Sequence, residues 1–291
     1  DIRPAIHAAG IGQVLEPGDL VEAAQTLRTA WGAHRVIEKV RDRIPRLAFI
    51  ADEIADFRRF TDEVDRAITP RGEVADNASE QLAITRRELR TAESRLDQRA
   101  QAALNDAIRR GVAQEGLLTE RNGRKVIPIK ADYRGQVQGI VHDVSSSGAT
   151  VFIEPMGVVD AGNQVRELQL AELREVRRVL QRLSAILGDM ETEALRSTVA
   201  LARLDVITAK VRLGRRMKAA LPPPGDVDSW FQPAGATVIK RGRHPLLRGE
   251  VVPTSIEVGG DYAGVLITGP NTGGKTVALK TLGLLTLMVQ A

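Results

Sequence analysis

A short segment near the end of the sequence has the residue types and the spacing of a phosphate-binding loop. A glycine and a Gly-Lys-Thr triplet are separated by four residues, and the segment consists of Gly269, Pro270, Asn271, Thr272, Gly273, Gly274, Lys275 and Thr276. Glycines let the backbone approach phosphate oxygens closely, and amide hydrogens at the start of a helix favour negative charge. We therefore expect this loop to bind ATP or GTP, with Lys275 at the β- and γ-phosphates and the Thr276 hydroxyl on Mg²⁺.

The residues on either side of this loop fit a nucleotide-binding domain. The apolar run from Tyr262 to Thr268 predicts a buried strand, and the proline-free run from Lys275 to about Gln290 predicts a helix. Hydrolysis also needs an acidic residue on another strand to hold Mg²⁺ and a group that orients water. Asp261 precedes the predicted strand and is expected at the surface. We therefore expect this chain alone to bind nucleotide weakly and to be inactive as an ATPase.

A second group of residues suggests contact with phosphates of another kind. Five cations crowd into a short β-type stretch, namely Arg121, Arg124, Lys125, Lys130 and Arg134. Glu120 and Asp132 lie among them, but the local balance is basic. Such a group is either a solvated surface or a sequence-independent contact with a nucleic-acid backbone. If it is the latter, neutralising Arg121, Arg124 and Lys125 together is expected to flatten the salt dependence of binding by about two to three units.

Other residues with chemical potential have simpler interpretations. Residues 243–245 (Arg-His-Pro) lie either near a nucleotide or in a structural turn before a strand. His142 is interpreted as a surface or packed histidine within an alternating strand, and Trp31 and Trp230 as packing residues. The absence of cysteine excludes disulfides and thiolate metal sites, and the four histidines show no metal-ligand spacing.

The elements that must position these residues are mainly helices. Ser79 is expected to cap a long helix to about Arg110, and a second long helix follows Pro155, so the simplest geometry is an antiparallel pair with the β module at its tip. The remaining expected helices are Leu20–Val40, with Asp19 as its cap, Asp52–Ile68 and Glu193–Met217. The expected strands are Arg124–Lys130, Gln138–Val144, Ala149–Ile153, Ala236–Lys240, Val251–Val258 and Tyr262–Thr268, and Leu221–Gly225 is the expected interdomain linker.

The composition restricts the class of protein. The chain has 291 residues, of which 43% are hydrophobic and 3% aromatic, and a core with few rings is typical of helix bundles. The net charge of +4 permits contact with nucleic acid without requiring it. No signal peptide and no apolar run of about 18 residues is present, so we expect a cytoplasmic protein with no membrane partner. We interpret a chain that starts at Asp1 and stops at Ala291, one helix after the loop, as part of a longer protein.

Three strings together resemble a known family. The phosphate loop followed by residues 277–285 (VALKTLGLL) resembles the MutS family of DNA repair ATPases, and residues 121–155 and 242–247 (GRHPLL) resemble its bacterial MutS-two branch. The resemblance implies a helical core or lever domain at 1–115 and 155–221, a clamp domain at 116–154, and the N-terminal part of an α/β, ABC-like P-loop ATPase domain at 226–291. The expected fold is therefore mainly α with a small antiparallel β insert.

The resemblance also implies a function for the full-length parent. It implies an ATP hydrolase that dimerises through its ATPase domains, acts as a clamp on branched or duplex DNA, suppresses homologous recombination and carries a C-terminal endonuclease domain. An ATPase that acts on stalled ribosomes through rRNA is an alternative, and an architectural DNA-binding arm with a vestigial nucleotide site is another. An SMC-like protein fits less well, because its phosphate loop precedes the coiled coil.

Overall fold

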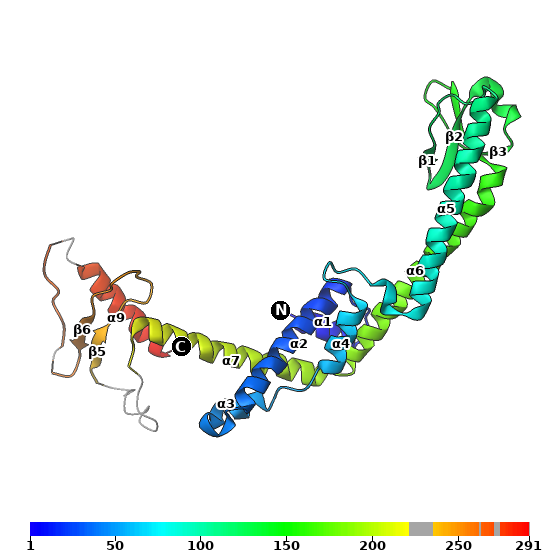
Figure 1. The fold of residues 1–291 in the computed structure, drawn as a ribbon. Helices are drawn as coiled ribbons and strands as arrows, with labels where there is room; N and C mark the ends of the chain where they lie inside the picture. Colours follow the sequence, from blue (N-terminus) through cyan, green and yellow to red (C-terminus); the bar gives the residue numbers. More distant parts are fainter. Residues whose placement is uncertain (221–234, 262, 271–273, 291) are drawn as a thin grey trace. The chain divides into compact units, whose positions relative to one another are not determined.

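The computed structural model describes residues 1–220, 235–261, 263–270 and 274–290. It is mostly helical with a small antiparallel sheet (Figure 1). The chain divides into two compact units, Asp1–Leu201 and Ala202–Ala291. The predicted linker at 221–225 lies outside the described residues, as does Trp230. None of the described helices is long and apolar enough to cross a membrane.

The first unit is built around a helical core. Its side chains include the fully buried Leu20, Leu27, Phe60, Leu183 and Leu187, so residues far apart in the sequence share one interior. The helices that supply this core are α1 (Arg3–Gly10), α2 (Pro17–Glu38), α4 (Arg58–Ala67), the end of α6 (Met156–Gly188) and the start of α7 (Glu191–Met217); the short α3 (Pro45–Ala51), η1 (Arg41–Arg43) and η2 (Asp76–Ala78) connect them.

Two predictions for these helices are wrong. The predicted helix Asp52–Ile68 begins only at Arg58, where the Asp56 carboxylate accepts the Arg58 backbone N–H at 2.9 Å. Ile54 and Phe57 are buried without being helical, so their spacing did not report a helix. Helix α2 begins at Pro17, whose fixed φ suits the first helical position, and Asp19 lies in its first turn rather than capping it.

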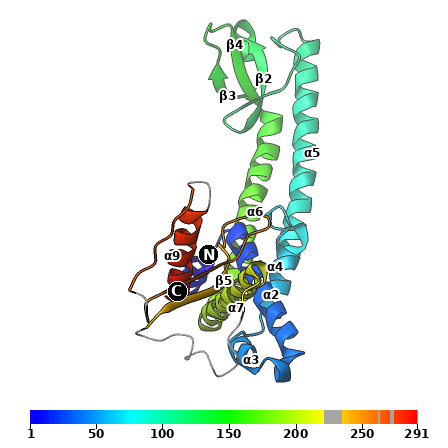
Figure 2. The same cartoon turned by 90° about the vertical axis from the view of Figure 1, so that its left-hand side faces the viewer.

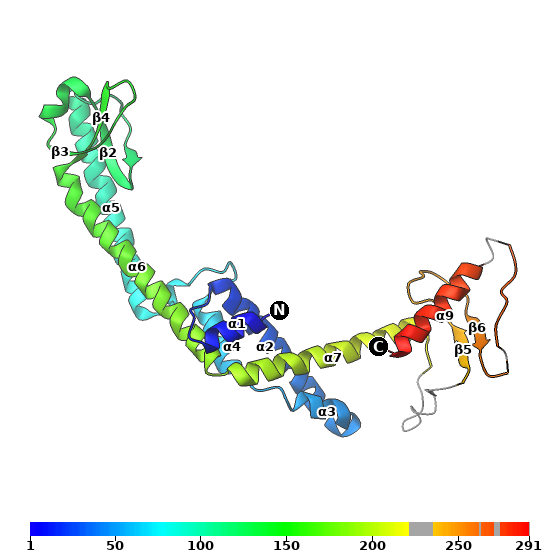
Figure 3. The ribbon, with the colours of Figure 1, turned by 180° about the vertical axis from the view of Figure 1, so that it is seen from behind.

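Helices α5 (Glu80–Arg109) and α6 pack side by side along much of their length (Figures 2 and 3). Ser79 caps α5 as predicted, because its hydroxyl accepts the Leu82 N–H at 3.0 Å. Leu82, Leu89 and Leu96, which lie one heptad apart along α5, are all buried. Leu89 and Leu96 share a cluster with Val158, Ala161 and Val165 of α6, and this seam fixes the two helices to each other.

A four-stranded antiparallel sheet lies at the end of this helix pair (Figure 1). Its order is β1-β2-β4-β3, and Ile127, Ile129, Val151 and Ile153 on one face pack against Leu104 at the end of α5. Strands β2 (Arg124–Lys130), β3 (Gly139–Val144) and β4 (Thr150–Pro155) agree with the predicted runs. β1 (Thr119–Arg121) was not predicted, and η3 (Ala131–Gln136) links β2 to β3.

Among its described residues, the second unit contains a hairpin and one further helix besides the end of α7. Strands β5 (Thr237–Gly242) and β6 (Thr254–Val258) pair antiparallel, and α9 (Lys275–Gln290) is helical as predicted. The predicted strand Tyr262–Thr268 is wrong for its described residues, which form no strand, and Leu266 is 88% exposed. A central strand needs neighbours to satisfy its backbone, and the described residues supply none beside this run.

Candidate nucleotide and nucleic-acid sites

In the described part of the phosphate loop, the first glycine and the lysine lie close together. The Lys275 ammonium donates a hydrogen bond to the Gly269 carbonyl oxygen, so the two ends of the loop meet. Gly269 and Gly274 have φ values of 140° and 80°, which only glycine adopts without strain. The three central residues of the predicted loop, Asn271, Thr272 and Gly273, lie outside the described residues.

The start of α9 completes the donor set. The exposed Thr276 lies in the first turn directly after Lys275, and the first helical N–H groups have no partner within the helix. An ammonium, a hydroxyl and the amides of one helix N-terminus fit a phosphate group with its magnesium ion. Within the described residues, no cluster of three or more His, Asp or Glu residues could hold a metal ion.

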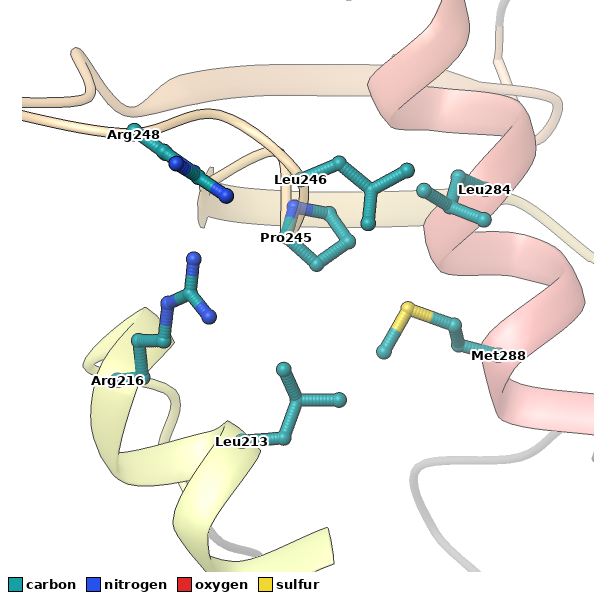
Figure 4. A pocket seen from close by; sticks show the side chains of 7 residues that line it. All are labelled: Leu213, Arg216, Pro245, Leu246, Arg248, Leu284 and Met288. Carbon is teal, nitrogen blue, oxygen red and sulfur yellow. The ribbon is translucent and has the colours of Figure 1, made fainter. Parts of the chain in front are cut away.

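A pocket of about 460 Å³ in the second unit is separate from this loop (Figure 4). Leu284 and Met288 of α9 contribute to it, nine residues or more beyond Lys275, which is about 14 Å along the helix. Its walls are Leu213, Arg216, Pro245, Leu246, Arg248, Leu284 and Met288. The pocket is therefore not the phosphate site, although the guanidinium groups of Arg216 and Arg248 face each other across it (Figure 4).

The predicted basic group is dispersed over the sheet, and Arg124 points inward. Its guanidinium donates to Asn163 at 2.7 Å and lies 3.4 Å from a carboxylate oxygen of Glu154. The Glu154 side chain is only 2% exposed, and its other oxygen is 2.7 Å from Nε2 of His142. Arg124 and His142 thus hold one buried carboxylate from two sides. A Cβ on Gly162 of α6 would lie 2.7 Å from the Arg124 guanidinium, so a larger residue there would displace the end of the Arg124 side chain from this network.

Three other predicted cations also have intramolecular partners. Lys125 pairs with the exposed Asp97 of α5 at 3.0 Å. Arg121 lies 3.2 Å from Asp143 and 4.3 Å from the centre of the Phe152 ring. Lys130 donates to the carbonyl of Gly111 at 3.0 Å. These partners are exposed or neutral, so exchanging them for a phosphate is less costly than removing Arg124 from Glu154.

Arg134 differs from the other four cations. It is exposed in η3, and its side chain makes no hydrogen bond, ion pair or ring contact with any described residue. It is thus the predicted cation most accessible to an external phosphate within the described part of the sheet.

Sequence reasoning missed Glu154, Asn163 and the role of Gly162. His142 was interpreted as a surface or packed histidine, and it is packed, because its ring contacts Glu154. It occupies the extra position of a β-bulge between Val141 and Asp143. A buried acid at the end of β4 gives no sequence signal of its own, because its two partners come from β2 and β3. The pairing can be recognised only once the strand order is known.

The remaining candidates are structural. The Leu246 N–H donates to Nδ1 of His244 at 3.3 Å, which is the turn geometry that was one of the two predictions for residues 243–245. Trp31 stacks on His34 with ring centres 4.7 Å apart, and Arg58 lies over its ring, so its predicted packing role is confirmed.

Comparison with known proteins supports the resemblance to the MutS-two branch. The whole chain aligns with proteins named Endonuclease MutS2, at 40% identity in Pelotomaculum thermopropionicum and 41% in Symbiobacterium thermophilum, and with a Putative endonuclease MutS2 of Bacillus subtilis at 39%. The chain is therefore similar over its whole length to one part of these MutS2 proteins. The resemblance drawn from residues 121–155 and 242–247 is therefore confirmed. The chain spans only 36–37% of the length of these MutS2 relatives. No family model matches it.

Proposed function

We propose that this chain belongs to an ATP-dependent, DNA-binding MutS-family protein that acts as a dimeric clamp on branched DNA and suppresses recombination. The observation that carries the proposal is a sheet with accessible cations at the end of α5 and α6, in a chain that also contains a phosphate loop. The sheet is the proposed clamp, the helix pair its arm, and residues 226–291 the start of the ATPase domain. The endonuclease activity in the relatives' names is proposed for the longer protein.

The proposed role of the arm follows from its length and its seam. Thirty residues of α5 span about 45 Å, and the cluster of Leu89 and Leu96 with Val158 and Val165 holds the two helices together in the middle of α5. A rigid pair transmits a rotation at its base to the sheet. Helix α7 has residues in both compact units, so it is the proposed connection between the nucleotide loop and the arm.

In the proposed nucleotide site, each residue has a binding task. The Lys275 ammonium would exchange the Gly269 carbonyl for phosphate oxygens, and Thr276 would hold Mg²⁺. Magnesium, when bound, neutralises the phosphate charge that develops during hydrolysis. Residues beyond the described ones would supply the second magnesium ligand, and a second copy of the protein would complete the dimer.

The nucleotide part of the proposal is tested in a full-length protein that contains this chain. Lys275→Ala removes the ammonium and is expected to abolish ATP-dependent strengthening of binding to a four-way DNA junction, measured by fluorescence anisotropy. Lys280→Ala changes an exposed lysine of the same helix and is the matched control, with no effect expected. Gating by ATP is wrong if Lys275→Ala leaves the nucleotide dependence unchanged.

The same protein distinguishes the alternative targets. Co-sedimentation with ribosomes and binding to four-way junctions are compared at matched salt, because both surfaces are rich in phosphates and screening weakens both. Preference for the junction supports the DNA clamp. Preference for ribosomes supports the rRNA alternative, and failure of the full-length protein to bind any nucleotide supports a purely architectural arm.

A further inference from the structure

The segment η3 presents an exposed aromatic ring at the end of the helix pair. The side chain of Tyr133 is exposed, with 39% of the residue's surface accessible. The chain has only two tryptophans, two tyrosines and five phenylalanines. Among the described ones, Tyr133 and Phe49 alone are exposed, and Phe49 belongs to α3 in the helical core region. An exposed ring in a chain with so few aromatic residues calls for a partner with an apolar face.

Cations flank this ring. The Lys130 ammonium lies 6.0 Å from the centre of the Tyr133 ring, and the exposed Arg134 follows Tyr133 directly. Asp132 is the acid within the same segment, so the two cations outnumber it. A ring beside an excess of positive charge suits a ligand that combines a flat apolar face with negative charge. An unpaired nucleotide has both, because its base is a π-surface and its phosphate is an anion.

The backbone beneath the ring is fixed before any ligand binds. The Arg110 guanidinium at the end of α5 donates to the Gln136 carbonyl at 2.8 Å, which ties the end of η3 to the helix. The Ala131 N–H donates to the Ala149 carbonyl at 3.0 Å, which ties its start to the sheet. A ring on a backbone held at both ends loses little conformational entropy on binding.

From these observations we infer that Tyr133 stacks on an unpaired base of a nucleic acid while Lys130 and Arg134 contact the adjacent phosphates. The inference rests on the proposed nucleic-acid binding and adds the kind of structure that is recognised. In a continuous duplex the base faces are covered by their neighbours, so only gaps, flaps and junctions offer this contact. Single-strand character, rather than sequence, is then what the tip of the helix pair detects.

The test compares two DNA ligands with the 291-residue chain. One is a blunt duplex, and the other is the same duplex with a short single-stranded gap. Tyr133→Ala is expected to weaken binding to the gapped duplex about tenfold and to leave the blunt duplex unchanged, since stacking on one base contributes about 1–3 kcal/mol. Tyr133→Phe keeps the ring and should bind like the unaltered chain. Phe49→Ala removes the other exposed ring and is the matched control. The same two ligands made of RNA show which nucleic acid supplies the base.

The outcomes separate this inference from the proposed function. If the unaltered chain binds both ligands and Tyr133→Ala changes neither affinity, the stacking role is wrong while nucleic-acid binding stands. Equal losses for Tyr133→Phe and Tyr133→Ala would also overturn it, because the hydroxyl would then be the contact. If the unaltered chain binds no nucleic acid, both the proposed function and the inference fail.

Discussion

Single residues of the basic group have different tasks. Arg124 holds a buried carboxylate together with His142, whereas the side chain of Arg134 is exposed and makes no hydrogen bond, ion pair or ring contact with a described residue. Arg124 lies in β2 and Arg134 in the η3 segment that follows it, and both were predicted as nucleic-acid contacts. Their environments separate a stabilising role from a binding role, because a buried ion pair is costly to break and an exposed cation is not.

This difference predicts opposite effects of two matched substitutions. Arg124→Gln leaves Glu154 with one partner fewer in a buried position, so the free energy of unfolding should fall by about 2 kcal/mol or more. Arg134→Gln should change stability by less than about 0.5 kcal/mol. Urea unfolding, followed by circular dichroism, measures both.

The salt dependence of DNA binding should be affected in the opposite order, more by Arg134→Gln than by Arg124→Gln. Arg134→Gln should reduce the slope of log K against log salt by about one unit, whereas a folded Arg124→Gln variant should keep its slope. A reduced slope for Arg124→Gln at unchanged stability would show that Arg124 contacts phosphate and that its pairing with Glu154 is not structurally important.

At the level of elements, α6 joins the sheet to the helical core through two close contacts. Gly162 leaves room for Arg124 near its beginning, and Gly188 at its end lies against the backbone of α1. A Cβ on Gly188 would stand 2.5 Å from the Ala9 carbonyl oxygen. The helix can pack this closely only because a hydrogen atom replaces a side chain at that position.

This contact predicts that substituting two glycines of α6 by alanine changes the free energy of unfolding by very different amounts. Gly188→Ala should lower the free energy of unfolding by about 1–3 kcal/mol, because backbone atoms must move apart. Gly157→Ala is the control, since no atom lies within 4 Å of the Cβ position there, and it should be neutral or stabilise by up to about 1 kcal/mol. Thermal unfolding compares the two, and equal shifts in Tm would contradict the packing argument.

The sequence predicts elements better than it predicts what joins them. The helix capped by Ser79 and three strands of the sheet follow from local patterns, and Asn122-Gly123, both with positive φ, gives the turn signal for the missed β1. The prediction of a helix at Asp52–Ile68 was wrong in its first part, because a buried irregular segment can have apolar residues at helical spacing. The strand Tyr262–Thr268 failed because pairing depends on neighbours. The Glu154 network was not predicted, because its residues come from four different elements.

At the level of the whole molecule, arginine-held carboxylates are concentrated in the first unit. Arg41 holds the pKa values of Glu38 and Asp52 below their ordinary values, Arg58 does the same for Asp56, and Arg86 for Asp76. Desolvation opposes each shift, but the hydrogen bonds from the guanidinium groups dominate. Arg41 links the ends of α2 and α3 through Glu38 and Asp52, and Arg86 links η2 to α5 through Asp76, so each pair makes a small contribution to the contact between two elements.

The direction of these shifts predicts acid sensitivity. The folded state favours the ionised carboxylates, so their stabilisation is complete above the ordinary pKa values of 3.8–4.5 and is lost as the pH falls below them through the lowered values. Urea unfolding should therefore show falling stability from about pH 5 to pH 3. Asp76→Asn should show a smaller fall than the unaltered chain, and an equal fall would contradict a contribution from this residue.

The bulge at His142 has a further consequence for how copies of this chain meet. β3 is an outer strand of the sheet, and Ile140 and Val144 on it are exposed. A flat, apolar outer strand is a template on which another chain can add its own strand. The extra residue interrupts the regular row of N–H and C=O groups and increases the local twist. The β-bulge that brings His142 to Glu154 thus also protects the protein from edge-to-edge aggregation at high concentration.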